Sequence, residues 1–222
     1  MKIGLLSDTH CQHNSVLIPQ GLNMIIHAGD FANSKSPVLN EHEIYNFIDW
    51  YSNLNIKYKI LIAGNHDTAL EAGLIKSKYI NSKGIYYLKD ETITIEGIKI
   101  FGSPYTPIFA KGWAYNVDRS KLHKHWALIE KNTDIIVTHG PPMGILDVTD
   151  NDGCNFQAGC KSLMRTILKI QPQYHIFGHL HDEPHIYNNG IKTIDICKTQ
   201  FMNVSMLDSE HNLIHKIKII EI

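Results

Sequence analysis

The chain has 222 residues, a formal net charge of −1, 43% hydrophobic residues and 19% charged residues, as an ordinary globular protein does. The sequence contains no Lys/Arg run, which argues against the basic footprint that long duplex nucleic acid requires. It also has no apolar run long enough to cross a membrane and no signal segment. We therefore expect a single domain over residues 1–222, a cytoplasmic location and four free cysteines.

The first part of the chain alternates short apolar stretches with an amphipathic helix. Residues 2–7, 22–27 and 58–63 are short, apolar and followed by polar or glycine residues, which predicts buried strands. A helix is predicted to begin at Ser36, as N-cap, and Pro37. Its inward face would consist of Ile44, Phe47, Ile48 and Tyr51. This strand–helix–strand order predicts parallel crossovers.

The middle and the tail of the chain differ in character. The elements predicted for the middle are helices over 68–78, 120–131 and 160–170 (ended near Pro172), a hairpin of 92–95 with 99–101, and strands over 134–138 and 174–177. In the tail, 183–187 and 192–196 flank Asn188-Asn189-Gly190, which is typical of a hairpin turn, and 203–207 with 213–220 predict another hairpin. Together these elements indicate mixed sheets flanked by helices.

Seven side chains that can bind metal ions follow the predicted strands. They are Asp8, His10, Asp30, Asn65, His139, His179 and His181. In an α/β sheet the carboxyl ends of strands present the chemistry, so we expect these side chains to meet. Asp8 and His10 are two residues apart, as are His179 and His181, so on extended backbone each pair would point the same way. Asp30 stands alone, as a carboxylate that bridges two ions would.

The charge of such a site indicates its substrate. Mixed oxygen and nitrogen ligands suit Mn, Fe, Zn, Co or Ni. Two divalent ions would bring four positive charges, against two negative charges from Asp8 and Asp30 and one from a hydroxide. The remaining positive charge would attract a phosphodiester monoanion and stabilise the charge that develops during attack on phosphorus.

The order of these blocks, Asp-x-His, Gly-Asp, Gly-Asn-His-Asp, His and Gly-His-x-His, resembles the calcineurin-like metallophosphoesterase superfamily over residues 1 to about 197. The resemblance implies a four-layer α/β/β/α sandwich with two mixed β-sheets flanked by helices. It also implies two metal ions, with Mn favoured. One would be held by Asp8, His10, Asp30 and His181, and the other by Asp30, Asn65, His139 and His179.

Further segments are similar to the small brain-type metallophosphoesterase-domain proteins and to microbial class III cyclic nucleotide phosphodiesterases. These segments are residues 102–107, 112–116, 138–147 and 175–179. The vertebrate members commonly carry Gly where this chain has His179, so His179 favours a competent site. By the same resemblance, a hydroxide bridging the metals would attack phosphorus. His66 would donate to the phosphate and protonate the leaving oxygen, and Asp67 would orient His66.

The leading hypothesis is a metal-dependent hydrolase of a small phosphodiester, either a cyclic nucleotide or an aryl diester. The alternatives are a protein or small-molecule phosphomonoesterase, a short-oligonucleotide nuclease, and a binding scaffold without activity. We expect no long nucleic acid and no membrane as partners, and homodimer formation is left open. Two side-chain roles are also open: Phe109, Trp113 and Tyr115 would either stack a nucleobase or anchor a loop, and His27 would either support a ligand or fill the core.

Overall fold

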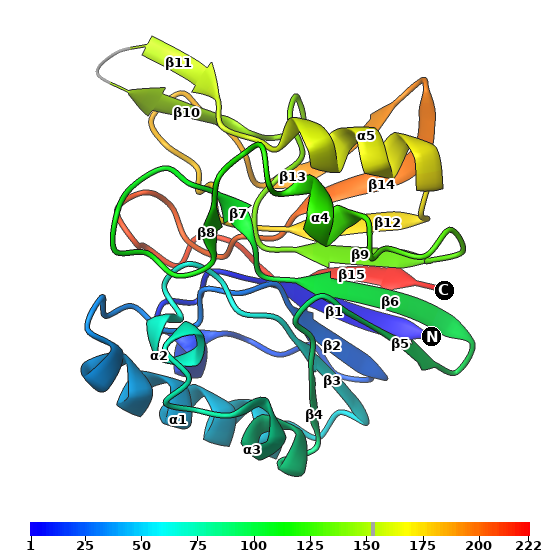
Figure 1. Ribbon diagram of the computed structural model, residues 1–222. Helices are drawn as coiled ribbons and strands as arrows, with labels where there is room; N and C mark the ends of the chain where they lie inside the picture. Colours follow the sequence, from blue (N-terminus) through cyan, green and yellow to red (C-terminus); the bar gives the residue numbers. More distant parts are fainter. Residues whose placement is uncertain (152–153) are drawn as a thin grey trace.

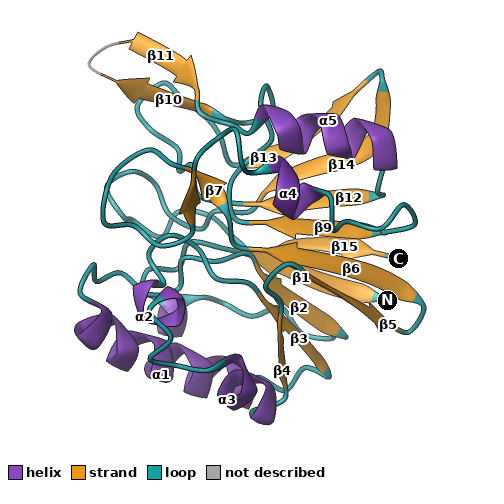
Figure 2. Ribbon diagram, in the orientation of Figure 1, coloured by secondary structure: helices purple, strands orange, loops and turns teal. Residues whose placement is uncertain are grey.

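Two β-sheets lie face to face between two groups of helices in the computed structural model, which describes residues 1–151 and 154–222 (Figures 1 and 2). Helices α1, α2 and α3 cover one side of the pair of sheets, and α4 and α5 cover the other. The helices are α1 (Pro37–Asn53), α2 (Thr68–Glu71), α3 (Ser77–Ser82), α4 (His123–Trp126) and α5 (Lys161–Ile170), with a 3-10 turn at His13–Ser15.

Both sheets are mixed. The first has the order β15 (Lys218–Glu221), β1 (Lys2–Leu6), β2 (Met24–His27), β3 (Tyr58–Leu61), β4 (Ile85–Tyr87), and β15 is antiparallel to β1 whereas the other pairs are parallel. The second has the order β13 (Gly190–Ile194), β14 (Cys197–Asn203), β12 (Tyr174–Phe177), β9 (Ile135–Thr138), β6 (Ile98–Ser103), β5 (Glu91–Ile95), with antiparallel pairs at both edges. Two small ribbons pair β7 (Thr106–Pro107) with β8 (Asn116–Val117), and β10 (Val148–Asn151) with β11 (Cys154–Gln157).

The alternation of apolar side chains along each strand builds the layers. On β1, Leu5 points into the core between the sheets, whereas Leu6 belongs to the core under α1. On β2, Ile26 likewise belongs to the core between the sheets, and Ile25 belongs to the core under α1. Because successive side chains of a strand point to opposite faces, a fully apolar strand serves two cores at once. The predicted four-layer α/β/β/α class is therefore confirmed.

The strands that lead to the motifs, the hairpin β5–β6, helix α1 and helix α5 are confirmed, with ends shifted by a few residues. Ser36 is the N-cap of α1 with Pro37 following it, although the Ser36 side chain makes no capping hydrogen bond. The single helix predicted over 68–78 is wrong. It divides into α2 and α3 around Gly73, whose φ of +72° is left-handed and incompatible with a continuous helix.

The helix predicted over 120–131 is also largely wrong, because only α4 is helical there. The flanking residues form turns closed by i to i+3 bonds, such as that from the Ile129 N–H to the Trp126 carbonyl. The predicted face is nevertheless right, since Leu122, Trp126 and Ile129 are all buried in the core beside α5.

Both tail hairpins were placed incorrectly. The carboxylate of Asp182 accepts hydrogen bonds from the backbone N–H groups of Asn188 and Asn189. These bonds hold Asn188 and Asn189 in a loop, and the predicted hairpin turn does not form there. The strand that follows, β13, instead pairs with β14. The last strand, β15, pairs with β1 at the other end of the sequence, and an isolated bridge between Leu207 and Leu213 is what the structure retains of the second predicted hairpin.

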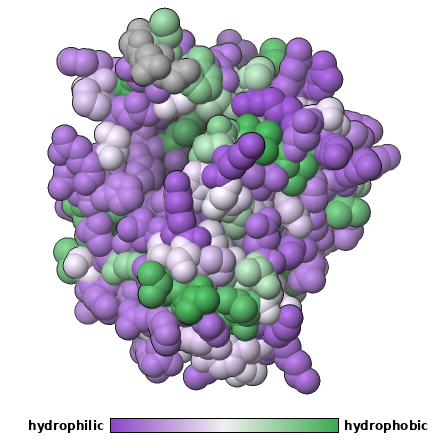
Figure 3. Space-filling model, turned by 60° about the vertical axis from the view of Figure 1, so that its left-hand side comes forward, coloured by the Kyte–Doolittle hydropathy of each residue, from purple (hydrophilic) through white to green (hydrophobic). Residues whose placement is uncertain are grey.

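The described helices include none that is both long and apolar enough to cross a membrane. The space-filling view of Figure 3 shows a mostly hydrophilic face on which hydrophobic side chains gather in small groups.

Candidate metal centre

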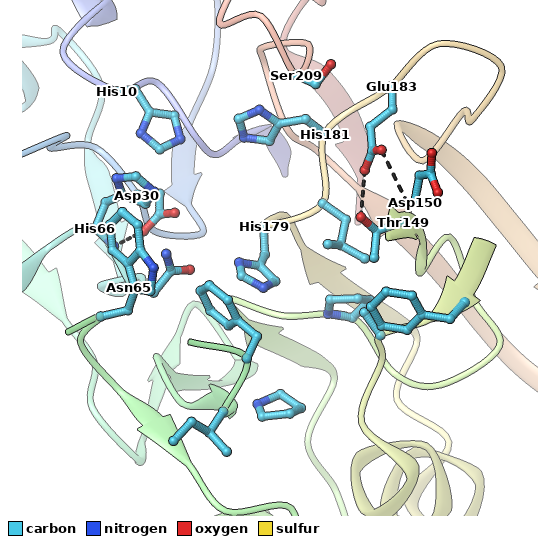
Figure 4. Close-up of a pocket in the computed structure, with 18 of the residues that line it drawn as sticks. His10, Asp30, Asn65, His66, Thr149, Asp150, His179, His181, Glu183 and Ser209 are labelled. Carbon is cyan, nitrogen blue, oxygen red and sulfur yellow. Dashed lines mark hydrogen bonds between the residues drawn. The ribbon is translucent and has the colours of Figure 1, made fainter. Parts of the chain in front are cut away.

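The structure brings the seven predicted ligands together at one end of the paired sheets. Asp8 and His10 follow β1, Asp30 follows β2 and Asn65 follows β3, so the first sheet supplies four of them. The second sheet supplies the rest, His139 after β9 and His179 with His181 after β12. Figure 4 shows Asp30, Asn65, His10, His179 and His181 arranged around one open space.

The backbone places these side chains in a way that the sequence analysis did not anticipate. The φ angles of Asp8, His10 and His179 are 53°, 38° and 72°, so these residues are left-handed and not extended. Asp30 is also left-handed, at 56°. The expectation that alternation along an extended strand points each Asp and His pair the same way is therefore wrong. Sharp turns bring these side chains together instead. Left-handed residues other than glycine are unfavourable, and their concentration here is typical of a functional site.

Asp30, His139 and Asn65 form the buried centre of the site. The Nδ1–H of His139 donates to the carbonyl of Ala28 at 2.9 Å. This leaves the Nε2 of His139 facing Oδ2 of Asp30 at 3.1 Å and Oδ1 of Asn65 at 3.0 Å. Burial opposes charge on the imidazole, but the Asp30 carboxylate prevails and raises the pKa of His139 to about 9. In the protein without metal, the Asp30 carboxylate thus favours a proton at this nitrogen.

Asp8 and His181 repeat this arrangement. The Nδ1–H of His181 donates to the carbonyl of Asp208 at 2.9 Å, and its Nε2 lies 3.6 Å from Oδ1 of Asp8. Asp8 is fixed by the hydroxyl of Ser7 at 2.5 Å and by the backbone N–H of His179 at 3.0 Å. Burial opposes ionisation, but the neighbouring His181 holds the pKa of the Asp8 carboxyl well below its usual value.

These contacts fit metal ions. In both His139 and His181 a backbone carbonyl fixes the Nδ1–H, and Nε2 is turned toward carboxylate oxygen, as in imidazoles that ligate a metal. Burial lowers the pKa of His10 and of His179 to about 3, so both imidazoles are neutral, as ligation requires. The Nδ1 of His10 is buried without a hydrogen-bond partner in the described structure. Among the described residues, three sets of potential ligands are close enough to share an ion, because the ligand atoms within each set lie within 4.8 Å of one another. The sets are His10–His181–His211, His10–Asp30–His66 and Asp30–His139–His179.

Glycines allow the ligands to approach this closely. A Cβ at Gly64 would overlap Oδ1 of Asp30 and would lie 2.5 Å from Cε1 of His139. A Cβ at Gly178 would overlap the side chains of Asp8 and Ser7. Any side chain at either position would push carboxylates out of the centre.

His66 faces the same space, and its orientation corrects one expectation. Its Nδ1–H donates to the carbonyl of Asn33 at 3.1 Å, and its ring lies 4.5 Å from that of His10. The carboxylate of Asp67 instead accepts from the backbone N–H groups of Asp30, Ala32 and Gly64 at 3.0, 3.0 and 2.7 Å. Asp67 therefore fixes the loops that carry the candidate ligands, and no described hydrogen bond joins its carboxylate to His66.

His27 lies directly behind the ligands. Its Nδ1 accepts from the N–H of Gly29 at 3.3 Å, so its Nε2–H donates to the hydroxyl of Thr9 at 3.1 Å. The ring also packs against Phe47 at 4.9 Å between centroids. His27 is thus a buried core residue that supports the backbone between Asp8 and His10, combining the two roles left open by the sequence.

A cavity of about 620 Å³ opens above the ligands. Its walls include Phe109, Trp113 and Phe156, of which Phe109 is 53% exposed and Phe156 is 47% exposed. The Trp113 ring lies 4.2 Å from that of His66, and Phe109 lies 5.2 Å from His179. Tyr115, in contrast, is buried beneath the loop, so within this aromatic segment it serves as the core anchor.

Several residues of this cavity carry no signal in the sequence that connects them to the site. His211, from the loop before β15, lies against the candidate ligands, and Arg119, Thr149, Asp150, Glu183 and Ser209 form part of the wall. These residues lie outside the motif blocks, and no spacing rule connects them to the ligands. His211 could have been suspected only as a further histidine in the tail.

The fold and the convergence of the candidate ligands are those of the metallophosphoesterase class, an α/β/β/α sandwich with a metal centre where the two sheets meet. Residues 1–183 match the family described as Calcineurin-like phosphoesterase, and the chain belongs to this family. It is 33% identical over 227 residues to human Metallophosphoesterase domain-containing protein 1, covering 90% of this chain and 67% of that protein. It is also 33% identical over 207 residues to UPF0046 protein K07C11.7 of Caenorhabditis elegans, covering 87% and 68%. A solved crystal structure with 16% identity superposes with a TM-score of 0.71 over 99% of this chain and 98% of the other, which is a likeness of fold.

Proposed function

We propose that the protein is a dinuclear-metal-dependent phosphodiesterase that hydrolyses small phosphodiesters, either cyclic nucleotides or aryl diesters. The observation that carries the preference for a diester is the charge of the cavity above the ligands. The same cavity supports a small substrate, because its volume of about 620 Å³ lies in the range of sites that bind small molecules.

The wall of the cavity carries little free positive charge. Among its described lining residues, Arg119 is the one Lys or Arg, and its guanidinium donates to the carbonyls of Gly159 and Ala158 at 2.8 and 2.7 Å. The wall also carries Glu183, which accepts from the hydroxyl of Thr149 at 2.7 Å (Figure 4), and Asp150. A monoester dianion would bring a second charge toward these carboxylates, whereas a diester would bring only one.

The ligands proposed for the two ions are those that the family resemblance implies, and the contacts of the site support them. When bound, two divalent ions, with Mn²⁺ favoured, would supply positive charge at the phosphate and lower the pKa of water at the site. Asp30 lies between the two groups of ligands and is the bridging carboxylate of the proposal. One group is Asp8, His10, Asp30 and His181, and the other is Asp30, Asn65, His139 and His179.

His66 is the proton donor in this proposal. The Asn33 carbonyl accepts the Nδ1–H, so the Nε2 of His66 faces the cavity, and in the imidazolium form it would carry the proton that passes to the leaving oxygen. The backbone N–H of His66 donates to Oδ1 of Asp30 at 2.6 Å, which couples its position to the bridging carboxylate. His66 therefore has both a fixed orientation and a free ring nitrogen beside the metal ligands.

The test compares matched substrates with several metals. We expect Mn²⁺-dependent hydrolysis of bis(p-nitrophenyl) phosphate with a kcat/KM at least about tenfold above that of p-nitrophenyl phosphate, which corresponds to about 1.4 kcal/mol. A panel of 2′,3′- and 3′,5′-cyclic nucleotides and linear dinucleotides then identifies the diester class. A reversed preference would favour the phosphomonoesterase. A metal content near zero, with no activity after Mn²⁺ addition, would favour the binding scaffold.

A further inference from the structure

His211 lies at the candidate metal centre although it belongs to the tail of the chain. It sits in the loop between β14 and β15, outside residues 1–183 that match the family. Its φ of 63° is left-handed, as are those of Asp8, His10 and His179. A left-handed histidine is unfavourable by itself, so the surrounding loop must hold it in place.

That loop is closed by Asp208. Its Oδ1 accepts from the N–H groups of Glu210 and Asn212 at 3.0 and 2.8 Å, and the N–H of His211 donates to the Asp208 carbonyl at 3.0 Å. The Asp208 carbonyl also accepts from Nδ1 of His181 at 2.9 Å. The loop is thus joined directly to one of the proposed ligands.

A second tie leads to the first motif. Gln12 lies two residues after His10 in the sequence, and its side-chain amide donates to the carbonyl of His211 at 2.7 Å. The two connections fix His211 from both sides, at His181 and at the segment that carries His10. Such positioning is what a ligand on a loop requires.

The imidazole completes a group of three. The ring of His211 stacks on that of His10, with centroids 4.8 Å apart and planes at 27°, and lies 5.7 Å from that of His181. One ring nitrogen from each histidine lies within 4.8 Å of the others. No described hydrogen bond engages the ring nitrogens of His211, whose imidazole is exposed toward the cavity. Three imidazoles that each present a ring nitrogen within this distance are suited to one transition-metal ion.

We propose that His211 is a further protein ligand of the metal ion that Asp8, His10, Asp30 and His181 would hold. The inference rests on the metal centre of the proposed function and is independent of the choice of diester. A fifth protein ligand leaves fewer positions at this ion for exchangeable ligands. It would therefore distinguish the two ions in affinity.

The test is Mn²⁺ binding to metal-depleted protein by isothermal titration calorimetry. His211→Ala is expected to weaken one of the two Mn²⁺ equilibria by about tenfold or more and to leave the other unchanged. Added imidazole should restore part of the lost affinity. His185→Ala is the matched control, because His185 is likewise exposed and left-handed, at φ 67°, but does not line the cavity.

The outcomes separate this inference from the proposed function. Binding of two Mn²⁺ with the same affinities in His211→Ala, His185→Ala and the unmodified protein would overturn the role of His211 while leaving the phosphodiesterase intact. Unchanged Mn²⁺ affinity with weaker inhibition by inorganic phosphate would assign His211 to the substrate and equally overturn it. If the unmodified protein binds no Mn²⁺, the proposed function fails first. Circular dichroism of each variant checks that the fold is retained.

Discussion

Nε2 of His139 and Oδ2 of Asp30 lie 3.1 Å apart and join the two sheets at the end where the candidate ligands meet. Asp30 follows β2 of the first sheet, and His139 follows β9 of the second. Neither strand would bring these charges together alone, so the packing of one sheet on the other forms the site. A bound cation would occupy the place where the structure otherwise favours a proton on His139.

Replacing Asp30, the carboxylate that we propose to bridge the two ions, should therefore remove metal before it removes the fold. Asp30→Asn keeps the shape of the side chain but loses its charge, so we expect metal affinity to fall by about 100-fold or more and hydrolysis to fall with it. Mass-spectrometric metal content and kcat measured on the same preparation test this. Asp49→Asn, at an exposed carboxylate on α1, is the control. Full metal occupancy in Asp30→Asn would show that Asp30 does not bridge.

His66→Gln should separate proton donation from metal binding. We expect kcat to fall by about 10²–10⁴-fold with the metal content unchanged, because the ring nitrogen faces the cavity and is not among the seven proposed ligands. The loss should be larger for a cyclic nucleotide than for a p-nitrophenyl diester, since a poor leaving group depends more on protonation. An equal loss for both substrates, or an intact kcat, would contradict the role assigned to His66.

Much of the site could be read from the sequence because its ligands follow short apolar strands. A strand with a buried apolar face has a local signature, and Asp30 or His139 immediately after it is a local feature too. The layers follow from the same signal. The sequence thereby identified which side chains would meet, and it attributed the convergence of Asp8 and His10 to the wrong backbone geometry.

What the sequence did not predict depends on contacts between distant segments or on single dihedral angles. The pairing of β15 with β1 joins the two ends of the chain, and local propensity carries no information about it. The break at Gly73 and the left-handed turns at the ligands are decided by tertiary contacts that offset local strain. His211 approaches the site through hydrogen bonds of its loop to Gln12 and His181, which no motif spacing records.

Trp113→Ala should reveal whether the aromatic wall binds a base. If a nucleobase stacks there, KM for a cyclic nucleotide should rise by about 5- to 150-fold, the equivalent of about 1–3 kcal/mol. KM for a dialkyl phosphodiester, which has no base, should stay the same. Lys35, whose Nζ lies 4.0 Å from the Trp113 ring, would be freed in the variant. Tyr187→Ala, at a ring that is 77% exposed and outside the cavity, is the control. If Trp113→Ala changed KM by the same factor for both substrates, or changed neither, base stacking would be removed from the proposal.

Acid should destabilise the metal-free protein because several buried histidines are neutral in the fold and protonated in the unfolded chain. His175 is one of these histidines, and its contribution can be measured separately. The hydroxyl of Thr138 donates to the carbonyl of Gly140 at 2.8 Å, so the Nε2–H of His175 donates to that hydroxyl at 2.8 Å. Its Nδ1 is left buried without a partner in the described structure, beside the ring of Phe177. Burial lowers the pKa of His175 to about 3, from 6.5 in an unfolded chain.

The sign follows from proton binding. Between pH 6.5 and pH 3 the unfolded chain binds the proton and the folded protein does not, so the contribution of His175 is present above pH 6.5 and is lost as pH falls. From pH 7 to pH 5 this loss is about 2 kcal/mol of unfolding free energy. His175→Phe cannot titrate, so its urea-unfolding free energy in EDTA should fall by about 2 kcal/mol less than that of the unmodified protein over this interval. EDTA keeps metal release out of the comparison, and the other histidines contribute equally to both proteins. Identical pH dependence in the two proteins would mean that burial does not lower the pKa of His175 in the fold.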